Sequence, residues 1–371
     1  MDCRFLINDG LAGDVFRRHL ALDAKAARLS RMMRLYYGYA RPIMPLRLRW
    51  LLQSRRNSKG QPSGWYLPQQ FMQELETAVE AVADGIPLIH PWPNAAPFAL
   101  VLTHDVEDEP GVRHCLALAE VEEDLGLRSS FNFVPYKYTI DQGIIRELQS
   151  RGFEIGIHGY NHDGRLFTSR KTFVRRTPPI NEAVRRYSAI GFRSPMVHRN
   201  LGWLQDLEVE YDASYFDIDP YQAMPGGVGG LWPFIAGRFV ELPYTLPQDH
   251  TLLIVLQERT PRIWEEKLEF IRRHRGMALM LTHPDYLTEP RPLALYRDFL
   301  AQVVQDGDFW HALPREVARW WRQRDASRLT SMADGEFAID GPAARLGRPA
   351  MMRVRDDALE ITSIAPVGAA R

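Results

Sequence analysis

Short apolar runs that alternate with helical stretches constrain the fold of this chain more than any other feature of its sequence. The apolar runs are FALVLTHD, SSFNFVP, FEIGIHG, GFRSP, FVELPYTL and MALMLTHPD. Stretches with helical periodicity, such as HCLALAEVEEDLGL, IIRELQSRG and WEEKLEFIRRHRG, separate most of them. Strands that alternate with helices typically pair in parallel. The pattern therefore predicts an α/β fold with a parallel sheet, either open or closed into a barrel.

The N-terminal region differs from this central part. Residues 15–40 and 71–85 carry apolar side chains at helical spacing, and Gly85 is expected to cap the second helix. Residues 86–97 contain four prolines and are expected to form a linker. We predict a mostly helical region over residues 1–96 and a βα region over residues 97–325.

The C-terminal region changes again. PREVARWWRQRDASR is typical of a final helix, and residues 351–364 alternate around Asp356-Asp357, which is typical of a β-hairpin. We therefore predict a small β-rich appendage over residues 326–371.

Composition excludes several classes of protein. The 46 basic residues balance 46 acidic ones, so the chain as a whole does not attract nucleic acid. Two cysteines, Cys3 and Cys115, are too few for a disulfide framework or a thiolate zinc site. No stretch approaches the roughly eighteen apolar residues of a transmembrane helix, and charged residues interrupt the first ten. We expect a cytoplasmic protein.

One segment departs from this charge balance. Residues 31–60 contain eight Lys or Arg and no acidic residue. This segment is either a solvated basic face or a contact surface for an anionic glycan, a lipid phosphate or a membrane surface.

Three polar clusters each follow a predicted strand. They are Asp105, Glu107 and Asp108, then His158 and His162, then His283. Ligands of parallel α/β folds bind at the carboxyl ends of the strands, so we expect the clusters to meet. Two histidines and one carboxylate are a known catalytic zinc set with an open position. A leftover carboxylate and a third histidine could serve as base and acid.

Each cluster also has a structural interpretation. The acidic residues could cap the next helix, the His-x-x-x-His pair could be accidental, and His283 could be a core histidine. We favour a metal site because the three clusters occur together, in this order, at strand ends.

The motifs in this order, with an Arg-x-Pro in GFRSP between the second and third, resemble the NodB-homology polysaccharide deacetylases, carbohydrate esterase family 4. The resemblance covers about residues 97–325, and HDVED is similar to the branch whose first motif has Asp-x-Asp or Asp-x-Glu spacing. It implies a distorted (β/α) barrel, usually of seven strands, here with a helical N-terminal extension and a small C-terminal β appendage. It also implies removal of acetyl groups from N-acetylated sugars by a divalent metal, usually Zn²⁺.

The resemblance also implies a role for individual residues. Glu107, His158 and His162 match the metal ligands, and Asp105 matches the base that takes a proton from water. Arg193 matches the residue that orients this base, and His283 matches the acid that protonates the departing amine. The backbone N–H of Met196 matches part of the oxyanion hole.

Departures from the family pattern leave some positions open. The commonest first motif is Thr-Phe-Asp-Asp-Gly, whereas Val106 separates the two acids here, so Asp108 is a second candidate ligand. Trp232 is a candidate for the acetyl pocket, and Tyr160 and Trp203 are candidates for stacking on sugar rings.

The expected function is metal-dependent removal of N-acetyl groups from an amino-sugar polysaccharide or a glycan precursor. Two alternatives stay open: a C–N hydrolase that acts on a small non-sugar amide, and a non-catalytic carbohydrate-binding relative of the same fold.

Overall fold

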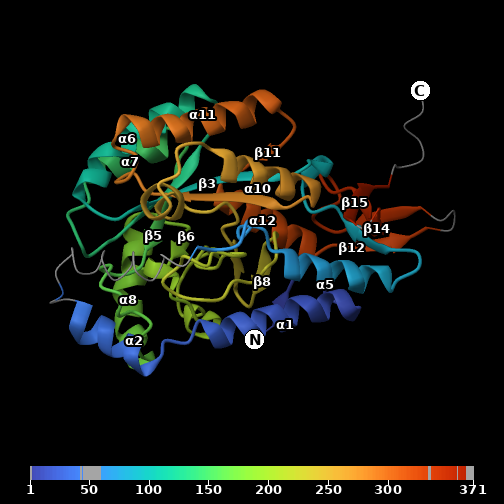
Figure 1. Cartoon of the computed structure of the whole chain (residues 1–371), viewed down its shortest axis with the longest axis horizontal. Helices are drawn as coiled ribbons and strands as arrows, with labels where there is room; N and C mark the ends of the chain where they lie inside the picture. Colours follow the sequence, from blue (N-terminus) through green and yellow to red (C-terminus); the bar gives the residue numbers. More distant parts are fainter. Residues whose placement is uncertain (1, 42–43, 45–59, 333–335, 357, 365–371) are drawn as a thin grey trace.

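One large and mostly parallel sheet organises the chain (Figure 1). The computed structural model describes residues 2–41, 44, 60–332, 336–356 and 358–364. The strands of this sheet are β1 (Cys3–Arg4), β3 (Ala99–Val106), β4 (Ser129–Phe133), β5 (Glu154–His158), β6 (Gly191–Arg193), β7 (Tyr211–Asp212), β8 (Phe234–Ala236), β9 (Phe239–Glu241), β10 (Met277–Thr282) and β11 (Trp310–His311). Their order is β1-β8-β9-β7-β6-β5-β4-β3-β10, with β11 beside β3.

The sheet curls into a distorted barrel. Within the described residues, seven consecutive strands of this order, β9-β7-β6-β5-β4-β3-β10, run parallel to one another. The segment after β9 reaches the far edge, where Leu246 forms a bridge with Met280 of β10. Every residue of β3 is buried, as expected for a parallel strand covered on both faces. The predicted seven-stranded (β/α) fold is confirmed.

Helices connect and cover the strands. They are α6 (Glu109–Asp124), α7 (Gln142–Ser150), α8 (Arg170–Arg186), α9 (Leu201–Leu204), α10 (Arg262–Arg273), α11 (Pro290–Asp306) and α12 (Pro314–Asp325). The N–H of Arg315 in α12 donates to Glu154, the first residue of β5, so α12 lies at the amino ends of the strands. In the part of the chain that the structure describes, none of the helices has the length and apolarity needed to cross a membrane.

The N-terminal extension is helical, but its breaks differ from the prediction. It contains α1 (Gly10–Ala26), α2 (Arg31–Leu35), the π-helical turn η1 (Tyr36–Ala40) and α5 (Gln69–Glu80). The helix expected over 15–40 is interrupted because Ser30 caps a new helix by accepting from Met33 N–H. The prediction that Gly85 caps the second helix is wrong, since α5 ends at Glu80. Gly85 instead adopts a positive φ of 77° in the turn that follows.

The linker predicted over residues 86–97 is also wrong. Ile86–Ile89 form strand β2, which pairs with β14 (Pro349–Arg355). Pro87 fits there because β2 is the edge strand of its three-stranded sheet, where a missing N–H is tolerated. A strand from the N-terminal region is therefore part of the C-terminal sheet.

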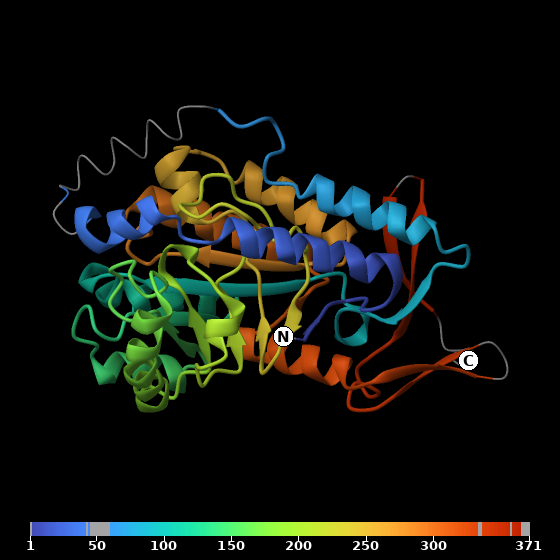
Figure 2. The same ribbon diagram turned by 90° about the horizontal axis from the view of Figure 1, so that it is seen from below.

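The C-terminal appendage contains the predicted hairpin. β14 pairs with β15 (Ala358–Ser363), and Arg355 lies opposite Ala358. Of the two aspartates predicted for the turn, Asp356 is described and Asp357 lies outside the described residues. A second pair joins β12 (Arg328–Ser331) to β13 (Phe337–Asp340). Figure 2 shows these strands at the end of the molecule away from α6, α7 and α8. The region boundaries at residues 96 and 325 stay a prediction.

Candidate metal centre

Three strand ends on the same side of the parallel sheet bring the predicted polar clusters together. Asp105 lies near the end of β3, and Glu107 follows that strand directly. His158 is the last residue of β5, and His162 lies in the loop after it. His283 directly follows β10, which pairs with β3 on its other side. Because all these strands run parallel, the five side chains meet at one edge of the sheet.

Three of these side chains form a compact group that could hold a metal ion, and this group is the candidate ligand set. Glu107, His158 and His162 each offer one ligand atom, and these atoms lie within 4.8 Å of one another. Glu107 Oε1 is 2.8 Å from His162 Nε2 and 3.8 Å from His158 Nε2. About a quarter of the Glu107 side chain is exposed (24%), so the set is open to solvent on one side.

The hydrogen bonds of His158 support a ligand role. Its Nδ1 lies 3.1 Å from the carbonyl oxygen of Arg193, a contact that requires a proton on Nδ1. In the neutral tautomer that makes this bond, the other nitrogen, Nε2, carries no proton. It is buried and has no hydrogen-bond partner among the described residues. An orphaned imidazole nitrogen beside a carboxylate and a second imidazole fits a divalent cation.

The electrostatics of the other two candidates agree with this fit. Burial lowers the pKa of His162 despite the neighbouring Glu107, which favours the neutral imidazole that binds metals. Burial raises the pKa of Glu107, but His162, His158 and His283 outweigh it and hold that pKa well below its ordinary value. Glu107 is therefore a carboxylate at neutral pH.

Gly159 makes the turn between the two histidines possible. Its φ is 68°, and a Cβ there would lie 2.4 Å from Cδ of Pro195. His162 also has a positive φ, of 58°. The loop thus folds back tightly enough for both imidazoles to face Glu107.

Asp105 lies beside the ligand set in a buried network. Its Oδ1 accepts from Asn132 Nδ2 at 2.9 Å and from an Arg193 guanidinium nitrogen at 3.2 Å. Arg193 also donates to the Ala213 carbonyl at 2.7 Å and to Thr103 Oγ1 at 2.9 Å. These bonds fix the guanidinium against the carboxylate.

The charge of Asp105 follows from this network. Burial raises its pKa, but His158, Arg193 and His283 outweigh burial and lower the pKa below its ordinary value. Asp105 is therefore ionised, and its second oxygen, Oδ2, lies 3.5 Å from His158 Nδ1.

His283 is paired with a buried carboxylate that the sequence did not reveal. Its Nδ1 lies 2.7 Å from Asp249 Oδ1, and its backbone N–H donates to Asp249 Oδ2 at 2.6 Å. Its Nε2 lies 3.7 Å from Glu107 Oε1. Burial lowers the pKa of His283, but Asp249, Glu107 and Asp105 outweigh it and raise that pKa to about 10. The imidazole is thus protonated at neutral pH.

Asp108, the second candidate ligand, does not join the ligand set. It is the N-cap of α6, and its side chain accepts from Gly111 N–H at 3.2 Å. The helix-capping interpretation of the acidic cluster therefore holds for Asp108, whereas Glu107 faces the histidines. Asp285 supports this arrangement by accepting from the Glu107 N–H at 3.0 Å.

The remaining candidates divide between the site and the core. Met196 has a positive φ of 57° in a short turn that begins at Pro195. Tyr160, in the loop that leads to His162, packs its ring against that of Tyr136 at a tilt of 34°. Trp232 does not line a pocket at this site: it is fully buried, and its indole N–H donates to the Arg275 carbonyl, before the start of β10.

Sequence reasoning missed three polar residues of the site. Asn132 carried a usable signal, since it interrupts an apolar strand and lies opposite Asp105 in the register of β3 and β4. Asp285 also carried a usable signal, because it lies only two residues after the candidate His283. Asp249 carried none, since 34 residues of chain separate it from the histidine that it contacts.

Comparisons with known proteins relate the fold to solved structures. No family model matches the sequence, and no curated protein matches it. The structure of a proposed polysaccharide deacetylase from Mycobacterium smegmatis matches with a TM-score of 0.53 and 21% identity, covering 63% of this chain and 93% of that chain. This chain therefore shares the fold of that protein.

Two further structures match at lower scores. A proposed polysaccharide deacetylase from Pseudomonas aeruginosa is 15% identical, covers 63% of this chain and 94% of that chain, and has a TM-score of 0.49. The chitin deacetylase of the fungal pathogen Colletotrichum lindemuthianum is 16% identical, covers 62% of this chain and 89% of that chain, and has a TM-score of 0.40.

Proposed function

We propose that this protein is a metal-dependent hydrolase that removes N-acetyl groups from an amino-sugar polysaccharide or a glycan precursor. One observation carries the proposal: beside the ligand set of Glu107, His158 and His162 lie an ionised carboxylate, Asp105, which is near His158, and a protonated imidazole, His283, which is near Glu107. Amide hydrolysis requires a base for the water and an acid for the poor amine leaving group. The shared fold with the mycobacterial protein supports the same reaction class.

We propose Zn²⁺ as the cation, held by Glu107, His158 and His162. Imidazole and carboxylate are ligands that Zn²⁺ accepts, and three protein ligands leave a position open for the reaction. The bound ion would polarise the amide carbonyl and make water acidic enough to attack near neutral pH.

In this proposal Asp105 is the base. Its carboxylate takes the proton of the attacking water, and Arg193 keeps it ionised and oriented through the 3.2 Å contact. This assignment places the HDVED motif in the Asp-x-Glu form, with the base at the first acid and the ligand at the second.

His283 is the proposed acid. The bond from Nδ1 to Asp249 leaves Nε2 on the side of Glu107, where it can donate a proton to the departing amine nitrogen. The backbone N–H of Met196 is the proposed donor to the carbonyl oxygen as negative charge develops there.

The proposed partner is an N-acetylated sugar polymer or its precursor. The basic segment 31–60 is a proposed peripheral contact for an anionic glycan or a membrane surface. Its described part, which ends at Arg41 apart from residues 44 and 60, exposes Met32 (81%) and Tyr39 (74%) beside basic residues. The rest of the segment lies outside the described residues.

Metal removal and substrate choice together test the proposal. Chelator-treated protein should lose hydrolysis of N-acetylglucosamine oligomers and regain it when Zn²⁺ is added. Asp105→Asn should stay inactive at every Zn²⁺ concentration, because the base is missing. Activity that survives complete metal removal would contradict the mechanism. Hydrolysis of small non-sugar amides in preference to the oligomers would favour the alternative substrate class.

A further inference from the structure

The loop that carries His162 contacts a segment far away in the sequence. Residues Tyr37–Arg41, within and just after η1, pack against this loop from the N-terminal extension. Arg41 donates from its guanidinium to the carbonyl oxygen of His162 at 3.2 Å, across 121 positions of sequence. The contact is made to the backbone of a proposed metal ligand.

A second arginine contacts this segment from the opposite direction. Arg165, three residues after His162, donates to the carbonyl oxygen of Tyr37 at 3.1 Å and to that of Gly38 at 2.5 Å. Each segment therefore supplies one arginine, and that arginine donates to the backbone of the other segment. Such bonds fix the backbones relative to each other and do not depend on the rotamer of an acceptor.

The ring of Tyr37 fills the remaining space at this contact. It is buried (5% exposed) and packs edge-on against His198, with ring centres 4.7 Å apart. Gly164 has a φ of 76°, and a Cβ there would lie 2.4 Å from Cδ1 of Tyr37. The loop thus takes a tightly turned path that fits the tyrosine ring.

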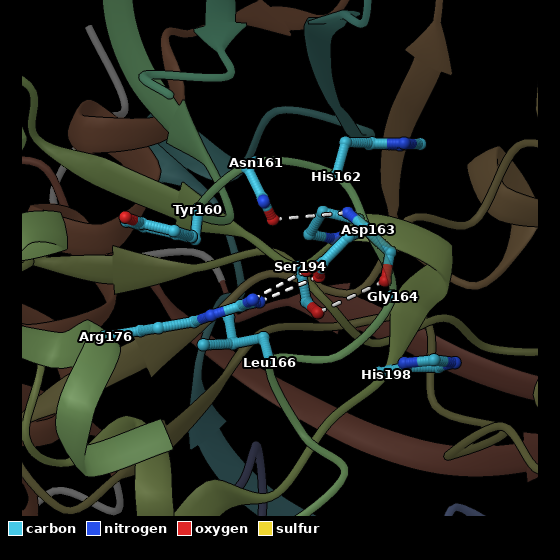
Figure 3. A pocket seen from close by; sticks show the side chains of 10 residues that line it. Tyr160, Asn161, His162, Asp163, Gly164, Leu166, Arg176, Ser194 and His198 are labelled. Atoms are coloured by element: carbon cyan, nitrogen blue, oxygen red, sulfur yellow. Dashed lines mark hydrogen bonds and ion pairs between the residues drawn. The ribbon is translucent and has the colours of Figure 1, made fainter. Parts of the chain in front are cut away.

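The inner side of the loop is held by the barrel itself. Asp163 accepts two bonds from the Arg176 guanidinium of α8, at 2.7 and 2.6 Å, as Figure 3 shows. The N-terminal extension is also anchored, since Asp23 of α1 forms a buried ion pair with Arg199. The loop is thus bonded to α8 on one side and to an anchored extension on the other.

We propose that residues Tyr37–Arg41 form a clamp that fixes His162 in its ligand position, with Arg41 and Arg165 as positioning residues. This inference rests on the proposed metal site. It also goes beyond the family likeness, which covers about residues 97–325 and does not include the clamp. His162 has a left-handed backbone conformation (φ 58°), which an unsupported loop would seldom hold.

Metal affinity, measured apart from catalysis, tests the clamp. Co²⁺ is titrated into metal-free full-length protein and followed by its visible absorption. Arg41→Ala and Arg165→Ala should each weaken Co²⁺ binding by about 10- to 100-fold, as is typical when a residue that supports a metal ligand is lost. Arg41→Lys, which keeps a donor, should recover part of the affinity.

Arg34→Ala is the matched control. Arg34 lies in α2, three residues before the clamp, and also donates to a backbone carbonyl, but its partner is Leu29 and not the His162 loop. This variant should keep the wild-type affinity for Co²⁺. Equal affinity in Arg41→Ala, Arg165→Ala and wild type would overturn the proposal.

Hydrogen exchange provides a readout that needs no metal. Amides of residues 159–165 in metal-free Arg41→Ala should exchange faster than in wild type, while those of β3 should not change. An unchanged exchange rate in the loop would also overturn the clamp. Wild-type protein that binds Co²⁺ but deacetylates nothing would contradict the proposed function alone, whereas wild-type protein that binds no metal would contradict both.

Discussion

At the scale of single residues, one buried carboxylate decides the charge of His283. The pKa of this imidazole is raised to about 10 by Asp249 and, at longer range, by Glu107 and Asp105. An ordinary histidine has a pKa of about 6.5. The pair therefore stabilises the folded protein fully below about pH 6.5, and this contribution is lost as the pH rises toward 10.

Asp249→Asn should reveal this pH dependence in metal-free protein. The variant should lose on the order of 3 kcal/mol of unfolding free energy near pH 6, since breaking a buried pair leaves one charge uncompensated. The difference from wild type should shrink as the pH approaches 10. Urea unfolding at pH 6, 8 and 10 measures it. In a His283→Gln background the same substitution should show no such trend, and a constant difference in wild type would contradict the assignment.

The two acids after β3 should respond differently to substitution. Glu107→Gln should weaken Zn²⁺ binding by more than about 100-fold, because a lost ligand costs more than a lost supporting residue. Asp108→Ala should leave Zn²⁺ affinity near wild type but lower stability by about 1 kcal/mol, since it removes the cap of α6. Calorimetric Zn²⁺ titration and thermal unfolding separate the two effects. The reverse result would make Asp108 the ligand.

Residue patterns predicted part of this site and missed the rest for a physical reason. Glu107, His158 and His283 were visible because each follows an apolar strand. The partners that set their charge and orientation come from distant segments: Asp249 contacts His283, and Arg41 contacts the His162 loop. Such contacts depend on tertiary packing, which leaves no periodic trace in a single sequence.

At the scale of elements, the turn after β5 controls the spacing of two proposed ligands, His158 and His162. Gly159→Ala should destabilise the protein by about 1–3 kcal/mol, because the new Cβ meets Pro195 and the backbone is left-handed. It should also weaken metal binding, since the turn carries both histidines. Gly126→Ala is the control: its φ is 72°, but nothing lies within 4 Å of the new Cβ. It should lose stability and keep metal affinity, as measured by thermal unfolding and Zn²⁺ titration.

Elements were predictable where a run was long and apolar. β3 and β10 were visible as continuous hydrophobic runs, and the hairpin of β14 and β15 as alternation around two aspartates. β2 was mistaken for a linker because Pro87 is unfavourable within most strands. Only its position at a sheet edge, beside β14, makes that residue acceptable.

At the scale of the whole molecule, the three sequence regions share one hydrophobic core. Phe16 of α1, Leu102 of β3 and Met352 of β14 belong to the same cluster of buried side chains. We therefore expect calorimetry of the full chain to show a single cooperative unfolding transition, with equal calorimetric and van't Hoff enthalpies. Two separate transitions, one of which disappears when residues 326–371 are deleted, would show that the appendage folds independently.

The pairing of β2 with β14 cannot form until late in the synthesis of the chain. About 260 residues must leave the ribosome between the two strands, which takes on the order of tens of seconds at translation rates of 5–20 residues per second. During that time the backbone of Ile86–Ile89 lacks its partner strand β14, and unpaired strand edges attract other chains. Pro87 has no backbone N–H to offer at this edge, so we expect the residue that obscured the strand also to make the nascent chain less prone to aggregate.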